Sequence, residues 1–256
     1  MNADSLRSRG GTRGFSLIEL ITVITIIIIL VGLLFPTITG FVKRGQRTQS
    51  LNSLKQIGAA YFQYRSDNNG RNLGLNLSKN PSTGQDAVFR ITNVYHIAYE
   101  FAWRGYLNEG AVYQIPTDLY VQQQGVEVLA VAERASSDAP WTLSETFSNA
   151  PVSFDLIAGL SSNAPASTPV ALTRGLDPST GKWSTDETVS PFGADGGHVA
   201  FLDGHVEWFE NINGELTNPV TRQPATTFLQ SISQGATVFG DPNKSLLDGR
   251  EGISGN

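Results

Sequence analysis

The chain has 256 residues, with 23 acidic and 18 basic side chains and a formal net charge of −5. A net acidic surface argues against nucleic acid as the main partner, because phosphate backbones select basic surfaces. The sequence has no cysteine, which excludes disulfides, thiolate nucleophiles and zinc–thiolate sites.

The most distinctive stretch runs from Arg13 to Pro36 and is almost entirely apolar. Its 21 residues from Phe15 to Phe35 carry one charge, Glu19. At 1.5 Å per residue, a helix of this length spans about 30 Å, the thickness of the hydrocarbon core of a bilayer. A carboxylate costs about 2.5–3.5 kcal/mol at the centre of such a span and less near its end, so we expect Glu19 to have a partner. The stretch predicts a membrane helix.

The residues around the start of this helix carry a resemblance. The segment before the helix, residues 1–13, is short and basic. The string GFSLIE that follows, residues 14–19, resembles the type IV prepilin cleavage and N-methylation motif of pilins and type II secretion pseudopilins. The resemblance implies that a prepilin peptidase cuts after Gly14 and methylates the new amino terminus on Phe15. It also implies that Glu19 neutralises the terminal amine of a neighbouring subunit during assembly, and that Pro36 is the helix-bending proline of this family.

Two other interpretations of the stretch remain open. A secretory signal would have an apolar core of about 7–15 residues and small residues at the cut, but nothing of that kind follows Leu34. A plain signal anchor explains the length, but it leaves Glu19 and the Gly14-Phe15 junction unexplained. Lysine and arginine are balanced on the two sides of the span, so the positive-inside rule gives no orientation. The motif predicts a cytoplasmic N-terminus and a periplasmic C-terminal domain.

After Pro36, the chain has helical periodicity again. Apolar residues recur at three- and four-residue spacing, which predicts one buried stripe: Leu51, Leu54, Gly58, Tyr61 and Phe62. Turn-forming residues at 67–70 should end this helix. The expected organisation is a cleaved leader (1–14), a transmembrane and assembly helix (15–36), the amphipathic half of the same spine helix (37–66), a periplasmic globular domain (67–240) and a flexible C-terminal tail (241–256).

The rest of the chain predicts a mixture of helix and strand. A second helix is expected over Thr92–Gly110, where apolar residues follow helical spacing. Strands are expected over Val126–Glu133, Pro151–Leu160 and Thr168–Leu176. The predicted fold class is therefore α+β, with a long N-terminal helix, half membrane span and half amphipathic, packed on an antiparallel sheet; the resemblance makes this arrangement pilin-like.

The clearest local signal is the run from Gly196 to Phe209, in which Asp203-Gly204 separates two apolar segments. This dipeptide favours a two-residue type I′ hairpin turn, since both central residues need positive φ. The turn pairs Phe201 with Val206, and alternation then gives one apolar face against the spine helix. That face consists of Val199, Phe201, Val206 and Trp208.

The same hairpin carries a second resemblance. The sequence FLDGHVE, residues 201–207, resembles a C-terminal signature of planctomycete and verrucomicrobial pseudopilin-like proteins. Many of these proteins have a histidine ten positions before the aspartate, where this chain has Gly193. Residues 54–70 also resemble the end of the spine helix in those families.

Candidate chemical sites are few. The sequence has no nucleophile motif, phosphate loop or Rossmann glycine pattern, so we expect no enzyme. His198, Asp203 and His205 lie at different levels of the hairpin and should not form a metal site. Calcium is the remaining candidate cofactor, with Asp186, Glu187 and Asp195 as candidate ligands; Asp241 and Asn243 begin a second acidic segment that lacks the glycine and glutamate of an EF-hand. Solvated turn acids are the default interpretation, with no cofactor.

The expected function is a structural subunit of a type II secretion or type IV pilus-like filament, processed after Gly14 and methylated on Phe15. Its expected partners are identical or related subunits, prepilin peptidase and the assembly platform of the inner membrane. The chain would lie in the inner membrane as a single-pass protein and then enter the filament. The alternative is a membrane-anchored periplasmic or surface module that binds or adheres and has no filament role.

Overall fold

The computed structural model describes residues 15–253, without the side chains of residues 33–43. The chain divides into two compact units, residues 1–45 and residues 46–256. Helix α1 (Leu17–Asp67) has residues in both units. It ends where Asn69 and Gly70 both adopt left-handed backbone conformations, with φ values of 56° and 78°. The amide of Gly70 donates to the carbonyl oxygen of Arg65 at 2.8 Å, which satisfies an otherwise free helix-end acceptor.

In the unit from residue 46 onward, α1 buries one face. Its buried positions follow the i, i+3, i+4, i+7 pattern of an amphipathic helix: Ser50, Ser53, Leu54, Ile57, Gly58, Ala60 and Tyr61. The predicted stripe is wrong at Phe62, which is 58% exposed, because this residue lies a further 100° around the helix. Ile57, fully buried, was missing from the predicted stripe.

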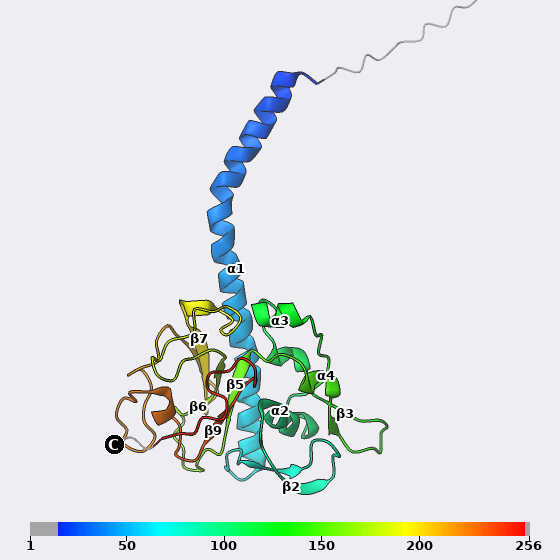
Figure 1. Ribbon diagram of the computed structural model, residues 1–256, viewed down its shortest axis with the longest axis vertical. Coiled ribbons are helices and arrows are strands. Elements are labelled where there is room, and N and C mark those ends of the chain that lie inside the picture. The colour runs from blue at the N-terminus through cyan, green and yellow to red at the C-terminus, as the bar shows by residue number, and fades with distance from the viewer. Residues whose placement is uncertain (1–14, 254–256) are drawn as a thin grey trace, which may run out of the picture. The chain divides into compact units, whose positions relative to one another are not determined.

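The centre of this unit is a five-stranded antiparallel sheet with strand order β8-β7-β6-β5-β9. Its strands are β5 (Phe154–Ala158), β6 (Pro169–Thr173), β7 (Gly197–Phe201), β8 (Val206–Phe209) and β9 (Thr237–Phe239). Strands β5, β6 and β7 are buried at every position, which reflects their apolar sequences. Figure 1 shows β6, β7 and β9 to the left of the lower part of α1, with α2 and α4 to its right.

Short helices and small sheets complete the unit. The helices are α2 (Val94–Trp103), α3 (Leu119–Gln124) and α4 (Glu145–Ser148), with 3-10 turns η1 (Gly110–Tyr113), η2 (Gly193–Asp195) and η3 (Phe228–Gln230). Strands β1 (Asn76–Lys79) and β2 (Asp86–Arg90) form one pair, and β3 (Ala132–Glu133) and β4 (Thr142–Leu143) form another. The strand predicted over residues 126–133 is therefore reduced to its last two residues.

Tyr61 connects α1 to both α2 and the sheet. Its ring packs edge-on against Phe101 of α2, with 4.8 Å between the ring centroids. Its hydroxyl donates to the carbonyl oxygen of Ile157 at 2.7 Å and accepts from the amide of Ile157 at 3.1 Å. One side chain thus joins the hydrophobic core and satisfies both backbone groups of a buried strand residue.

The predicted fold class needs correction. The expected arrangement was pilin-like, with a helix that is half membrane span and half amphipathic packed on an antiparallel sheet. The described domain is instead a mixture of a five-stranded sheet, two small sheets and several short helices. Over the part of the chain that the structure describes, no helix is long and apolar enough to cross a membrane.

The hairpin register also differs from the prediction. Ala200 pairs with Val206 and His198 with Trp208, one position away from the predicted pairing. The turn has three residues, since Gly204 donates to Phe201 at 2.9 Å and Phe201 donates to His205 at 3.0 Å. Such a loop needs one left-handed residue at its end, and Gly204 supplies it with φ 88°. The predicted apolar face is therefore split: Val206 and Trp208 share a face with His198 and Ala200, while Phe201 lies on the opposite face with Val199.

The segment expected to be a flexible tail is packed where the structure describes it. Leu247 is fully buried and Asp241 is 1% exposed. The amide of Val238 donates to Arg250, and that of Gly252 donates to Ala236. Residues 241–253 therefore form an ordered extension beside β9.

Candidate functional site

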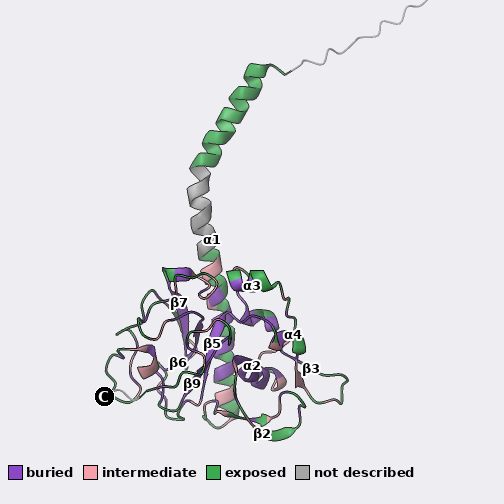
Figure 2. Ribbon diagram, viewed as in Figure 1, coloured by how far each residue is buried: buried purple, intermediate pink, exposed green. Residues whose placement is uncertain are grey.

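The most unusual surface of the chain is the first part of α1. Every described side chain from residue 15 to residue 32 is exposed, and Figure 2 shows this part of the helix in the colour of exposed residues. The exposed fractions are 78% for Phe15, 72% for Ile18 and 53% for Val31. Isolated exposed apolar residues are normal on a protein surface, but a continuous apolar segment of this length marks an interaction site.

Glu19 is the one charged residue in this segment, and it caps the helix. Its Oε2 atom accepts a hydrogen bond from the amide of Ser16 at 2.9 Å. This is one half of a capping box, in which the acid three residues into a helix satisfies a free amide at the helix start. Thr22 and Thr25 donate to the carbonyl oxygens of Ile18 and Ile21, so their hydroxyls are also satisfied within the helix. Glu19 therefore has a local partner in addition to any intermolecular one.

The other predicted processing and assembly residues are placed only in part. Gly14 lies outside the described residues, so the cleavage junction has no structural description. Phe15 is the first described residue and is exposed. Pro36 lies within α1, in the segment whose side chains are not described.

The hairpin lies against α1 through the face that carries His198, Ala200 and Trp208. Trp208 therefore meets α1 as predicted, whereas Val199 and Phe201 lie on the opposite face. The Ser50 hydroxyl of α1 lies 3.2 Å from Nδ1 of His198. The guanidinium of Arg47 lies over the Trp208 ring at 4.0 Å, and its Nη2 atom reaches Oδ2 of Asp195 at 3.4 Å. Farther along α1, Gly58 approaches the hairpin loop at Gly204. These contacts fix the position of α1 on the sheet.

His198 is the most perturbed histidine of this contact. Its ring lies 4.8 Å from that of Trp208, in an edge-on arrangement. Burial, reinforced by the nearby Arg47 charge, lowers the pKa of His198 to about 4. The imidazole is therefore neutral at physiological pH and acts as a packing and hydrogen-bonding group. His205 is on the other side of the hairpin, stacked on Phe201 with 4.1 Å between centroids.

The predicted calcium ligands have separate roles. Oδ1 of Asp186 accepts from the amide and the hydroxyl of Thr188, at 2.8 Å each. Asp195 pairs with Arg47, and Glu187 lies beside Gly193. Asp241 accepts from the amides of Val152 and Asn243. Within the described residues, no group of three or more histidine, cysteine or acidic side chains could hold a metal ion, so the structure does not bring the calcium candidates together.

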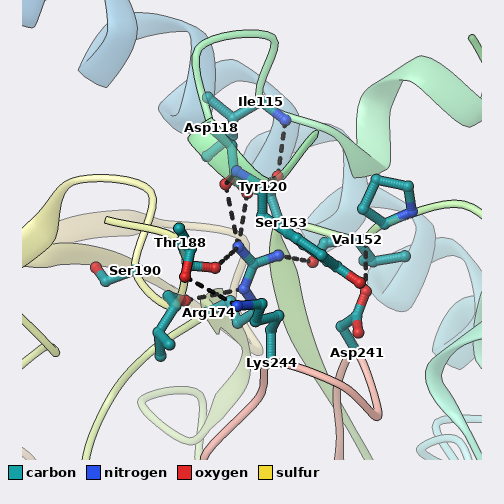
Figure 3. A network of polar contacts seen from close by, with 12 residues as sticks. Ile115, Asp118, Tyr120, Val152, Ser153, Arg174, Thr188, Ser190, Asp241 and Lys244 are labelled. Atoms are coloured by element: carbon teal, nitrogen blue, oxygen red, sulfur yellow. Dashed lines mark hydrogen bonds and ion pairs between the residues drawn. The ribbon is translucent and has the colours of Figure 1, made fainter. Parts of the chain in front are cut away.

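A buried ion pair inside the domain was not predicted. Arg174 and Asp118 are both fully buried, and Nη2 of Arg174 donates to Oδ2 of Asp118 at 2.9 Å. The Nε and Nη1 atoms of Arg174 donate to the carbonyl oxygens of Val189 and Val152. Asp118 also accepts from the Ser153 hydroxyl at 2.8 Å. Figure 3 shows the guanidinium enclosed by these acceptors.

This pair ties four distant parts of the chain together. Arg174 follows β6, Asp118 is the N-cap of α3, Val152 precedes β5, and Thr188 and Val189 belong to a long loop. Lys244 of the C-terminal segment donates to the Thr188 hydroxyl at 2.8 Å and lies over the Tyr120 ring. The available sequence signal was an arginine directly after the apolar strand 169–173, a position where a charge needs a buried partner. The sequence alone does not identify that partner.

Comparisons with protein-family models, curated proteins and solved structures return no match.

Proposed function

We propose that this chain is a structural subunit, of pseudopilin or pilin type, of a type II secretion or type IV pilus-like filament. The observation that carries the proposal is the exposed apolar segment of α1, residues 15–32, with Glu19 as its one charge. An apolar helix exposed along its length gains stability when it packs against similar helices. The partners of this segment are then the same segments of identical or related subunits.

The GFSLIE motif adds the processing step to this proposal. Prepilin peptidase cuts after Gly14 and methylates Phe15, and the subunit passes from the inner membrane, through its assembly platform, into the filament. The capping bond occupies Oε2 of Glu19, and the remaining oxygen accepts from the Phe15 ammonium of a neighbouring subunit. Between packed apolar helices this charge pair is screened less than a surface pair, so it fixes the relative register of two subunits. The proposal assigns no catalytic residue.

Two variants of Glu19 separate an assembly role from a capping role. Glutamine retains the hydrogen bond of a capping box but has no charge, whereas alanine removes both. We expect Glu19→Gln and Glu19→Ala both to be processed and folded, and both to fail in filament assembly. Assembly is measured by cross-linking and by sedimentation of sheared filaments from the producing cell. Glu145→Gln, at an exposed acid on α4, serves as the matched control and should assemble normally.

If Glu19→Gln assembles like the natural chain, the charge has no assembly role and only its capping function remains. That result would favour the alternative of an anchored binding or adhesion module. Such a module has no role in a filament, so replacing Glu19 should not change filament assembly.

A further inference from the structure

Asp155 occupies an unusual position for a carboxylate. It lies in β5, an interior strand of the five-stranded sheet, and has no exposed surface. The register of β5 with β9 pairs Leu156 with Phe239, so the next position places Asp155 opposite Gly240. A Cβ atom at Gly240 would overlap Oδ1 of Asp155 and the Ser245 hydroxyl. Glycine at position 240 therefore allows the C-terminal segment to close directly over the carboxyl group.

The segment that closes over Asp155 consists of residues 240–249. Its own hydrogen bonds hold it in shape: the amide of Gly240 donates to Oδ1 of Asp248 at 2.9 Å, and the amide of Ser245 donates to the carbonyl oxygen of Asp241 at 2.8 Å. The amide of Gly249 donates to the carbonyl oxygen of Val238 on β9. Asp155 is thus enclosed between the sheet and a compact turn.

Neither oxygen of Asp155 has a hydrogen-bond partner among the described residues. The other buried acids nearby differ: Asp118 has Arg174, and Asp241 has two backbone amides. The charged groups facing Asp155 are Arg174, which is already engaged by Asp118, together with Asp241 and Asp248. An ionised carboxylate at this position would be desolvated and would lie near two other acids, which outweighs the stabilisation that the Ser245 hydroxyl and the Arg174 charge offer, so the neutral form is favoured.

We propose that Asp155 is a proton-dependent clamp: the protonated carboxyl group lets residues 240–249 close over β5, and loss of that proton opens this segment. Opening would expose the fully buried Leu247 and would release Lys244 from Thr188 and Tyr120. Figure 3 shows Asp241 and Lys244 of this segment beside the Arg174 ion pair, so the same opening would uncover one side of that pair.

The direction of the pH dependence follows from the difference in the pKa of Asp155 between the closed and the open state. Burial raises the pKa of Asp155 to about 7, with Asp248 and Asp241 adding to the increase while Ser245 and Arg174 oppose it. A group whose pKa is higher in the closed state than in the open one stabilises the closed state fully at low pH. That stabilisation is lost as the pH rises toward 7. The opening equilibrium should increase on the order of tenfold per pH unit between about 5 and 7, and should then level off.

Hydrogen exchange of the full-length chain, followed by mass spectrometry from pH 5 to pH 8, tests the proposal. Protection factors of peptides covering residues 237–252 are corrected for the intrinsic pH dependence of exchange. In the natural chain they should fall on the order of tenfold per pH unit between about 5 and 7. In Asp155→Asn, an uncharged variant of the same shape, they should stay constant. Asp86→Asn, at an exposed acid, should retain the pH dependence of the natural chain.

The proposal is overturned if the natural chain and Asp155→Asn show the same pH dependence in this segment. A second measurement covers the case in which Asp155→Asn fails to fold. Carbon-13 spectra of the natural chain, labelled at the aspartate carboxyl groups, should show Asp155 ionising near pH 7. Ionisation below about pH 5, the ordinary range of an aspartate, would equally overturn the proposal.

Discussion

At the scale of single residues, Arg174 has the most demanding position in the domain. Its guanidinium has no contact with solvent, and its donors are directed to Asp118, Val152 and Val189. A buried ion pair adds little to stability compared with apolar residues of the same shape, but removal of one partner leaves a buried charge without compensation. The pair therefore acts mainly by fixing the relative positions of the segments that carry it.

Replacement of Arg174 tests this role. Arg174→Met keeps much of the apolar stem but removes every donor, and we expect the free energy of unfolding to fall by about 3–5 kcal/mol. Urea denaturation at pH 7 measures the change. Arg71→Met, at an exposed arginine, should change the free energy of unfolding by less than about 0.5 kcal/mol. A loss below about 1 kcal/mol for Arg174→Met would show that the ion pair is not needed to hold these segments together.

At the scale of elements, the contact between α1 and the β7–β8 hairpin depends on a close approach at Gly58. A Cβ atom there would lie 3.9 Å from the Cα atom of Gly204 and 4.0 Å from the Cβ atom of Ala200, which is ordinary van der Waals contact. The site therefore has room for one methyl group and not for a larger side chain. The glycine itself weakens the helix because of its backbone freedom.

Two substitutions at Gly58 measure that space. Gly58→Ala should raise the free energy of unfolding by about 0.5–1 kcal/mol through helix propensity. Gly58→Leu should lower it by about 1–3 kcal/mol because the side chain would force α1 away from the hairpin. Thermal unfolding of the two variants measures the change in the free energy of unfolding, which should be positive for alanine and negative for leucine. Equal effects of alanine and leucine would contradict the close packing of α1 on the hairpin.

The elements also show which features a sequence specifies. The ranges predicted for strands 151–160 and 168–176 contain β5 and β6, because buried apolar runs between turn signals are a strong local signal. The hairpin was expected at its observed place but with the wrong register. Asp203-Gly204 is compatible with both a two-residue and a three-residue loop. A shift of one residue in the pairing of the two strands places each side chain of one strand on the opposite face of the hairpin.

Other features depended on long-range contacts that a local pattern does not contain. Residues 126–131 have the composition of a strand, but Leu129 and Val131 bond to the backbone of residues 108–110, Val131 also accepts from the amide of Ser144, and the result is only an isolated bridge between Glu109 and Ala130. The partner of Arg174 lies 56 positions earlier in the chain. The C-terminal segment was expected to be flexible, yet it packs beside β9 and closes over Asp155. In each case tertiary packing decided the outcome.

At the scale of the whole chain, an ordered domain is joined by one helix to an exposed apolar segment. The domain from residue 46 onward has its own hydrophobic core, whereas the described side chains of residues 15–32 are exposed throughout. A surface of this kind is stable only when something covers it. In the proposed function, neighbouring subunits cover it, and cleavage after Gly14 creates the charged terminus that pairs with Glu19.

The most direct test of this account is the mass of the mature chain and of its N-terminal peptide, measured on protein purified from the producing cell. We expect a chain that begins at Phe15 and carries one added methyl group on its terminal nitrogen. A chain that retains residues 1–14, or that begins at another residue without the methyl group, would contradict it.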